Sequence, residues 1–219
     1  MYDTIEGELI AAGYEAHTMI LKTKSFGIPQ ARERMNLVAT NKKATRGKKF
    51  EFPEPHRKLI PLKTLLGGDE DTPIRRVTSK SLQAMLPPAT EKRARKIVVG
   101  AVKKFVKEHS AQDLKELVLV IDTGSSPKFA RCMVNIFPTI TASRGSDLGY
   151  WIIMNGKGRR VTPLDLLRLQ GIPPKTVNYV KAGLSPGRIG HMCGNTMSKN
   201  ILDALLPKVL GAIGIKPTG

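Results

Sequence analysis

The chain has 219 residues, enough for one large domain or two small ones. It carries 36 Lys and Arg residues against 18 Asp and Glu residues, a formal net charge of +18, and 41% of its residues are hydrophobic. The hydrophobic content excludes a wholly disordered chain. The charge makes nucleic acid the first partner to consider, with an inert basic surface as the alternative.

The first 40 residues predict a helix, a strand, a turn and a second strand, an order in which α/β sheets often end. Asp3 and Glu6 have capping-box spacing, and Gly13 is suited to ending the helix. Extended stretches follow at 14–24 and 32–40, separated by the turn sequence FGIP.

A change of composition near residue 50 predicts a domain boundary. Residues 50–88 are rich in proline and glycine, whereas 91–108 have apolar residues at helical spacing and a second face of lysines and arginines. That basic face is open to two interpretations, a solvated surface and a row of phosphate contacts.

The second half of the chain predicts strands at 117–122, 133–141 and 148–154 and then two helices. Thr162 is a helix N-cap residue, followed by proline at the first helical position and Asp165 at the third, and Gly171 is suited to ending this helix. The last helix is predicted at about 197–210.

Cysteine and histidine positions indicate neither a disulfide framework nor a metal site. Cys132 and Cys193 are the only cysteines, and the four histidines are scattered without zinc-ligand spacing. The N-terminus lacks the features of a signal peptide, and no apolar stretch is long enough to cross a membrane. We therefore expect an intracellular protein with no metal and no membrane partner.

Three polar side chains alternate at the entry to the second strand, namely Gln30, Arg32 and Arg34. A period of two predicts that they share one face of the strand. An amide and two guanidinium groups in a row are suited to holding a carboxylate, a phosphate or the carbonyl edge of a base. A surface ladder of salt bridges is the alternative.

Four segments together resemble the cytosine-5 DNA methyltransferases. Residues 26–34 (FGIPQARER) resemble the eighth conserved motif of that family, and residues 138–145 (PTITASRG) with 159–173 (RRVTPLDLLRLQGIP) resemble the ninth motif and its approach. Residues 194–197 (GNTM) resemble the tenth. The order and the spacing also match, and the resemblance covers nearly the whole chain.

The sequence also departs from the family, and the departures show which part it resembles. The Gly-rich cofactor loop and the Glu-Asn pair that grips the cytosine are missing. The nucleophilic cysteine after a proline is also missing, because Cys132 follows arginine and Cys193 follows methionine. Smaller departures are Asp165, where the family usually has glutamate, and Ser198, where proline is common. The chain therefore resembles only the C-terminal half of such an enzyme.

The resemblance implies a fold and a division of the chain. The fold class is α/β, the C-terminal part of a Rossmann-like fold dependent on S-adenosylmethionine (SAM), plus a small mixed α+β target-recognition domain. Residues 1–49 would end the catalytic domain, 50–190 would form the target-recognition domain, and 191–219 would hold the tenth-motif helix that returns to the catalytic domain.

The resemblance also implies roles near the catalytic pocket. Arg34 would hydrogen-bond the flipped cytosine and orient the missing glutamate, Arg32 would support the nucleophile loop or a phosphate, and Gln30 would help to form the pocket wall. Asn195 and Thr196 would contact SAM, with a backbone N–H at a helix start suited to its carboxylate. A plain helix N-cap is the alternative for Asn195.

Other residues would have structural or DNA-binding roles. Asp165, Arg168 and Gln170 match the ninth motif and are predicted to organise the target-recognition domain, with Arg168 pairing inward with a carboxylate or with backbone carbonyls. Phosphate contacts are expected from the basic helix and from Arg75, Arg76, Lys80 and Arg144.

The expected function is that of the C-terminal portion of a DNA (cytosine-5-)-methyltransferase, inactive alone and needing a complementary N-terminal half. It would be a subunit of a split enzyme, a fragment or a degenerate remnant, located with DNA in a nucleus or in a bacterial cytoplasm and nucleoid. A non-catalytic DNA-binding remnant is the alternative from another class. A tRNA cytosine-5 methyltransferase is a weaker one, because its recognition region would be smaller.

Overall fold

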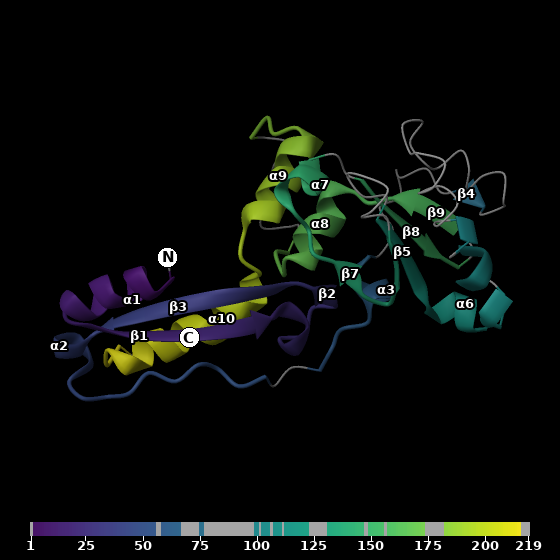
Figure 1. Cartoon of the computed structure of the whole chain (residues 1–219). Helices are drawn as coiled ribbons and strands as arrows, with labels where there is room; N and C mark the ends of the chain where they lie inside the picture. Colours follow the sequence, from purple (N-terminus) through teal and green to yellow (C-terminus); the bar gives the residue numbers. More distant parts are fainter. Residues whose placement is uncertain are drawn as a thin grey trace.

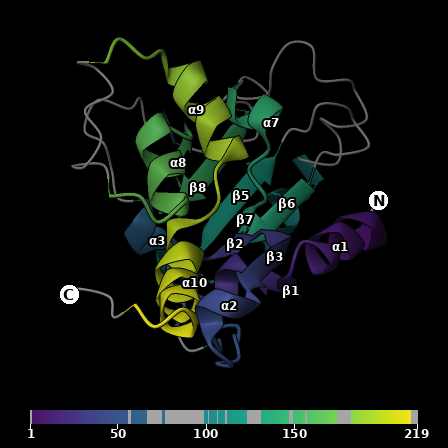
Figure 2. The same ribbon diagram turned by 90° about the vertical axis from the view of Figure 1, so that its left-hand side faces the viewer.

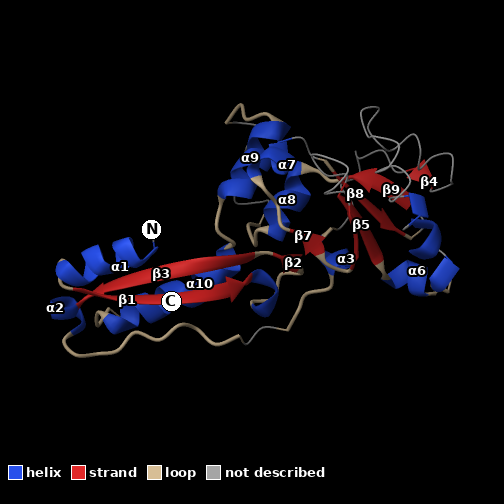
Figure 3. Cartoon of the chain, viewed as in Figure 1, coloured by secondary structure: helices blue, strands red, loops and turns tan. Residues whose placement is uncertain are grey.

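The structure is a computed structural model that describes residues 2–55, 58–66, 75–76, 99–100, 102–105, 107–110, 112–122, 131–146, 149–155, 157–173 and 182–215. Its elements form two lobes (Figure 1). A ribbon lobe contains the N-terminal strands and the last helix, and a sheet lobe contains most of the middle of the chain. Figure 3 shows that long strands dominate the first lobe, whereas helices cover the sheet of the second.

The ribbon lobe is built on a two-stranded antiparallel sheet, in which β1 (Tyr14–Lys22) pairs along its whole length with β3 (Glu33–Asn41). Helix α10 (Lys199–Ala212) packs on one face, where Leu21 and Phe26 contact Ile201. The remaining elements are α1 (Tyr2–Ala11), the 3-10 helix η1 (Thr23–Ser25) and α2 (Lys42–Thr45). The last helix of the chain thus completes the core of the first strands.

The sheet lobe has a five-stranded antiparallel sheet in the order β4-β9-β8-β5-β6. Its strands are β4 (Arg75–Arg76), β5 (Val118–Asp122), β6 (Arg131–Val134), β8 (Tyr150–Met154) and β9 (Lys157–Arg160). Every residue of β5 is buried, which fits a central strand covered on both faces.

Each face of the five-stranded sheet has its own core. Val120 and Ile152 face a large cluster with the helices, whereas Leu119 and Ile121 face Phe105. The helices of this lobe include α3 (Leu62–Leu65), α6 (Asp113–Glu116), α7 (Ala142–Ser146), α8 (Pro163–Leu169) and α9 (Pro186–Asn195). Figure 2 shows α7, α8 and α9 grouped on the same side of the molecule.

The two lobes join at several places, two of which involve the motif segments. Strand β2 (Gln30–Ala31) pairs in parallel with β7 (Phe137–Pro138), and residues 196–198 connect α9 to α10. These two junctions include residues of the segments that resemble the eighth, ninth and tenth motifs.

Most predicted elements are confirmed, with several differences. The extended stretch predicted at 133–141 contains two short strands, β6 and β7, in place of one. The second strand begins at Glu33, because Arg32 lies in the break between β2 and β3. Helix α9 was not predicted, and it contains the expected domain boundary between residues 190 and 191. The long helix expected at 91–108 is helical where it is described, and its first eight residues lie outside the described part.

Candidate functional site

Polar residues of the eighth and ninth motifs meet the backbone of the tenth motif, and Ser198 just after it, where the lobes join. Gln30, Arg32, Gln170 and Ser198 are each at most 5% exposed, and they hydrogen-bond to one another's segments. We call this set the polar junction. Buried polar groups are stable when their hydrogen bonds are made, so these contacts fix how the segments meet.

Arg32 is at the centre of the junction. Its Nη1 donates to the carbonyl of Ile140 at 2.9 Å, and its Nη2 donates to the carbonyls of Gly194 at 3.2 Å and Thr196 at 2.7 Å. Burial lowers the pKa of the Arg32 guanidinium, and the positive charge of Arg34 lowers this pKa further. Among the described residues, no carboxylate forms an ion pair with Arg32.

Gln30 and Gln170 add two further links. The Gln30 amide donates to the Leu169 carbonyl at 3.4 Å, and its Oε1 has no hydrogen-bond partner among the described residues. The Gln170 amide donates to the Cys193 carbonyl at 2.7 Å and its Oε1 accepts from Ser198 Oγ at 3.0 Å. Gln170 thus ties the end of α8 to the end of α9.

Contacts beside the junction extend it into the ribbon lobe. Ser198 Oγ lies 3.1 Å from Thr23 Oγ1, and Asn200 donates to the carbonyls of Thr23 and Phe26 at 3.3 and 2.8 Å. Neither Ser198 nor Asn200 was predicted as a contact between segments. The sequence signal for such a contact was the presence of polar residues at the start of an amphipathic helix.

Arg34 differs from the other two residues of its motif. It is exposed, and its Nη1 donates to the carbonyl of Glu33 at 2.8 Å. The sequence predicted one shared face for Gln30, Arg32 and Arg34. In the structure the first two are buried and the third is exposed.

The ninth-motif helix begins with a complete capping box. Thr162 accepts from the Asp165 amide at 3.2 Å, and Asp165 accepts from the Thr162 amide at 2.8 Å. At the other end, Gly171 has a φ of +73°, a conformation that favours glycine. The start and end of α8 are therefore as predicted from the sequence.

Asp165 also has a partner that was not predicted. Arg159 contacts both carboxylate oxygens, at 2.5 and 3.0 Å, and donates to the Leu66 carbonyl at 3.0 Å. Arg168 lies farther from Asp165, at 3.7 Å, with 26% of its side chain exposed. The buried ion pair that organises this region is therefore Arg159–Asp165. Nothing in the strand sequence KGRR distinguishes Arg159 from Arg160.

Asn195 and Thr196 do not head a helix, which corrects the helix-start argument. Asn195 is the last residue of α9, and α10 begins four residues later at Lys199. The Asn195 amide lies 3.1 Å from His191 Nε2, and the Thr196 hydroxyl donates to the Met197 carbonyl at 3.3 Å. Because a helix C-terminus carries partial negative charge, it disfavours a carboxylate.

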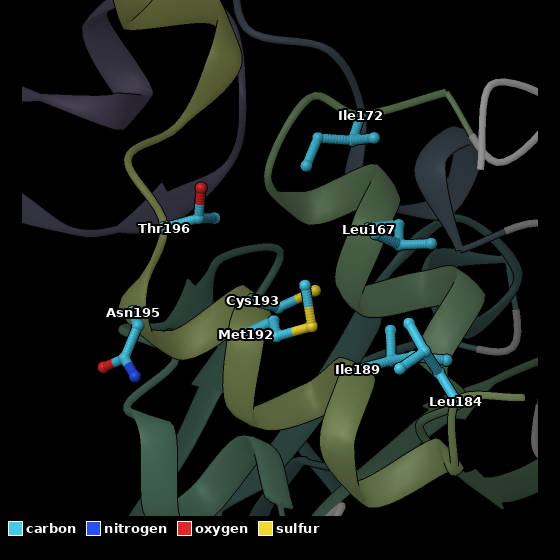
Figure 4. Close-up of a pocket in the computed structure, with 8 residues that line it drawn as sticks. All are labelled: Leu167, Ile172, Leu184, Ile189, Met192, Cys193, Asn195 and Thr196. Carbon is cyan, nitrogen blue, oxygen red and sulfur yellow. The ribbon is translucent and has the colours of Figure 1, made fainter. Parts of the chain in front are cut away.

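A cavity of about 420 Å³ adjoins Asn195 and Thr196 (Figure 4). Apolar side chains form the rest of its lining, namely Leu167, Ile172, Leu184, Ile189, Met192 and Cys193. The Asn195 amide and the Thr196 hydroxyl would suit polar atoms of SAM, but none of the described lining residues is a carboxylate that could hold a ribose. The described residues therefore fit this cofactor only in part.

Neither cysteine has the properties of a nucleophile. Burial raises the pKa of the Cys132 thiol and that of the Cys193 thiol to about 11. A thiol must ionise to attack, and these groups remain protonated near neutral pH.

The predicted DNA-binding residues are only partly described. Arg75 and Arg76 form the edge strand β4, where they pair with Gly158 and Lys157 of β9, and their side chains are outside the described part. Arg144 lies in α7 with its side chain likewise undescribed, and Lys80 is outside the described residues altogether.

Other basic side chains are exposed on the sheet lobe. Arg160 lies 5.6 Å from the ring centre of Trp151, and the helical segment near Phe105 exposes Lys103, Lys104 and Lys107. Among the described residues, no group of three or more acidic, histidine or cysteine side chains could hold a metal ion, and no helix is long and apolar enough to cross a membrane.

Known proteins similar to this chain are methyltransferases. A curated relative, the type II methyltransferase M.NgoBI of Neisseria gonorrhoeae, is 27% identical over 88% of this chain and 50% of its own length. The type II methyltransferase M.HaeII of Haemophilus aegyptius is 25% identical over 98% of this chain and 56% of its own length. The chain thus spans about half the length of these relatives.

A solved structure is similar in fold. The Entamoeba histolytica methyltransferase EhMeth matches with a TM-score of 0.54 and 14% identity over 96% of this chain and 57% of its own. This similarity confirms the predicted mixed α/β methyltransferase fold. The family model described as C-5 cytosine-specific DNA methylase matches residues 1–210. The chain belongs to the C-5 cytosine-specific DNA methylase family.

Proposed function

We propose that this chain is the C-terminal portion of a DNA (cytosine-5-)-methyltransferase that works only with a complementary N-terminal half. Together the two would transfer the methyl group of SAM to cytosine C5 through a covalent cysteine adduct. The observation that carries this proposal is the polar junction. It unites the segments of all three motifs. Both thiols of the chain are protonated near neutral pH, so the nucleophile is assigned to the other half.

An exposed apolar surface on the ribbon lobe supports the need for a second half. Ile20 and Met35 are opposite each other in the β1–β3 register, and they are 60% and 58% exposed. Leu37, two residues along β3 and on the same face as Met35, is also exposed. A two-stranded sheet is marginally stable by itself, and exposed apolar patches of this kind mark interaction sites.

Arg34 is the residue of this chain best placed to act on the substrate. It is exposed at the start of the ribbon and donates one hydrogen bond to a neighbouring carbonyl, so its other N–H groups are available to a ligand. A guanidinium has five N–H donors in a planar fork. In the proposed enzyme Arg34 would bind the carbonyl edge of a flipped cytosine and a carboxylate of the other half.

DNA binding is proposed for the basic surface of the sheet lobe. Lys103, Lys107 and Arg160 are exposed there, and Arg75 and Arg76 are at the edge of the sheet. Such residues attract the phosphate backbone without reading sequence. The protein would then act wherever its DNA is, in a nucleus or in a bacterial cytoplasm and nucleoid.

The structure suggests where the proposed division of the chain should be placed. The catalytic portion would comprise 1–49 and the tenth-motif helix, and 50–190 would be the target-recognition domain. Because α9 packs within the sheet lobe, we move the second boundary to residues 196–198, between α9 and α10.

A second candidate function is a DNA-binding module without catalysis. The observation that favours it is the sheet lobe, whose buried residues from Leu62 to Cys193 form a continuous core without the ribbon strands. Such a lobe could persist and bind DNA after the chemistry was lost.

Complementation distinguishes the two functions. The chain should be produced together with the N-terminal half of a cytosine-5 methylase, and methyl transfer from labelled SAM to DNA measured for the pair and for each half. Our proposal predicts activity for the pair and none for either half. Activity of this chain alone, lost in Cys132→Ser or Cys193→Ser, would contradict it. DNA binding by the chain that no N-terminal half converts into methylation would favour the module.

A further inference from the structure

The C-terminal end of α9 is held by side chains from outside the helix. The last carbonyls of a helix have no partner within it and must find one elsewhere. Here the Cys193 carbonyl accepts from Gln170, and the Gly194 carbonyl accepts from Arg32. The same Arg32 nitrogen also donates to the carbonyl of Thr196, the C-cap residue.

Arg32 also connects α9 to the segment before α7. Its Nη1 donates to the Ile140 carbonyl, and next to this contact Gly194 packs against the backbone of Thr141 and Ala142. A side chain at residue 194 would overlap that backbone, so the close approach requires glycine. The guanidinium thus bridges the two segments beside the place where their backbones touch.

The electrostatics of the site match a cap rather than a ligand-binding group. The guanidinium is 5% exposed and faces three carbonyl oxygens, two of them at the negative end of the α9 dipole. Each of these bonds has a charged donor, and such bonds are about twice as strong as neutral ones. Arg34, in contrast, is exposed and has one hydrogen bond to a neighbouring carbonyl.

We propose that Arg32 is a positioning residue, which caps α9 and thereby holds Asn195, Thr196 and the turn into α10 in the arrangement that receives SAM. This differs from the role expected by resemblance, in which Arg32 supports the nucleophile loop or a phosphate. The SAM part of the inference rests on the proposed function. The capping part does not, because it depends only on contacts within this chain.

The first test measures amide hydrogen exchange in the full chain for Arg32→Met and Arg32→Lys. Arg32→Met removes every donor, whereas Arg32→Lys keeps the charge but loses the fork that bridges the carbonyls. We expect the amides of Thr196 and Lys199 to exchange about tenfold faster or more in Arg32→Met. Losing one charge-assisted hydrogen bond raises the equilibrium constant for local opening by about that factor. Arg32→Lys should lie between Arg32→Met and the unchanged chain.

Two control variants make this test specific. Arg34→Met removes a guanidinium two residues away, and Arg188→Met removes an exposed one from α9 itself. Neither variant should change the rate of amide hydrogen exchange at residues 194–199. If Arg32→Met does not fold, Arg32→Lys decides the outcome. Unchanged exchange at 194–199 in folded Arg32→Met or Arg32→Lys would overturn the capping role.

The second test uses the enzyme assembled with an N-terminal half. A positioning role predicts that Arg32→Lys raises the KM for SAM about tenfold while kcat changes by less than about threefold, the size of effect expected when a supporting contact is lost. A fall in kcat with unchanged KM would instead assign Arg32 to the reacting cytosine and overturn the SAM part. If no N-terminal half restores methylation but the exchange result holds, the proposed function fails and the capping role stands.

Discussion

Loss of Arg159 should destabilise the sheet lobe far more than loss of Arg168. Asp165 is fully buried and accepts two hydrogen bonds from Arg159, which is 4% exposed, so Arg159→Met would leave a buried carboxylate with the donors of its cap and the more distant Arg168. Breaking a buried ion pair costs about 3–5 kcal/mol. Arg168 is 26% exposed and its Nη1 lies 3.7 Å from the same carboxylate, so Arg168→Met should destabilise the chain less than Arg159→Met does.

Melting of the chain measures this difference directly. Trp151 is the single tryptophan, and it lies on β8 beside β9, so its fluorescence reports on the strand that carries Arg159. For a chain of this size, about 3–5 kcal/mol corresponds to a fall in Tm of roughly 6–20 °C.

A variant without the carboxylate charge at position 165 provides the control. Asp165→Asn removes the charge, so Arg159→Met should destabilise that variant less than it destabilises the unchanged chain. An equal loss of stability from Arg159→Met in the unchanged chain and in Asp165→Asn would refute this assignment of the buried pair. A larger loss of stability for Arg168→Met than for Arg159→Met would also refute it.

Three other results are expected. Gly190→Ala should cost about 1–3 kcal/mol in denaturant unfolding, because the added methyl group would overlap the Gly145 carbonyl where α7 crosses α9, whereas Gly211→Ala, at an open position of α10, should not destabilise. Burial raises the pKa of the thiols of Cys132 and Cys193 to about 11. Iodoacetamide should therefore modify the folded chain slowly at pH 8, and the free energy of unfolding should fall as pH rises from about 9 to about 11, because the unfolded thiols ionise first; rapid modification would contradict this burial. If about six phosphates are neutralised, log affinity for DNA should fall with log salt at a slope near −5, and a slope near zero would refute phosphate binding.

Local features of the fold could be predicted from the sequence because neighbouring residues determine them. The capping box of Thr162 and Asp165 and the positive φ of Gly171 depend on a few adjacent residues, and α8 has the predicted start and end. The β1–β3 hairpin likewise follows from two extended stretches around a turn.

Helix α9 was missed because its composition opposes a helix prediction. It has a good N-cap at Ser185 and a proline at its first position, but it also contains Gly187, Gly190 and Gly194. Glycine disfavours an isolated helix. Gly190 and Gly194 are required instead for the close crossing with α7, a tertiary contact that no local pattern reveals.

The roles of the arginines could not be separated from spacing alone. Arg32 and Arg34 have the same local pattern, yet Arg32 bonds to carbonyls between 108 and 164 residues away, whereas Arg34 stays exposed. Arg159 and Arg168 present the same problem around Asp165. Which arginine is buried depends on how distant segments pack, so the sequence gives candidates and the fold selects among them.

Trapping of the covalent adduct tests the central claim most directly. In DNA with 5-fluorocytosine at the target site, attack at C6 and methylation at C5 leave a carbon that cannot lose a proton, so the enzyme–DNA bond persists. We predict that the assembled pair forms this adduct on a cysteine of the N-terminal half, with unchanged yield in Cys132→Ser. DNA attached to a peptide of this chain that contains either cysteine would contradict the account.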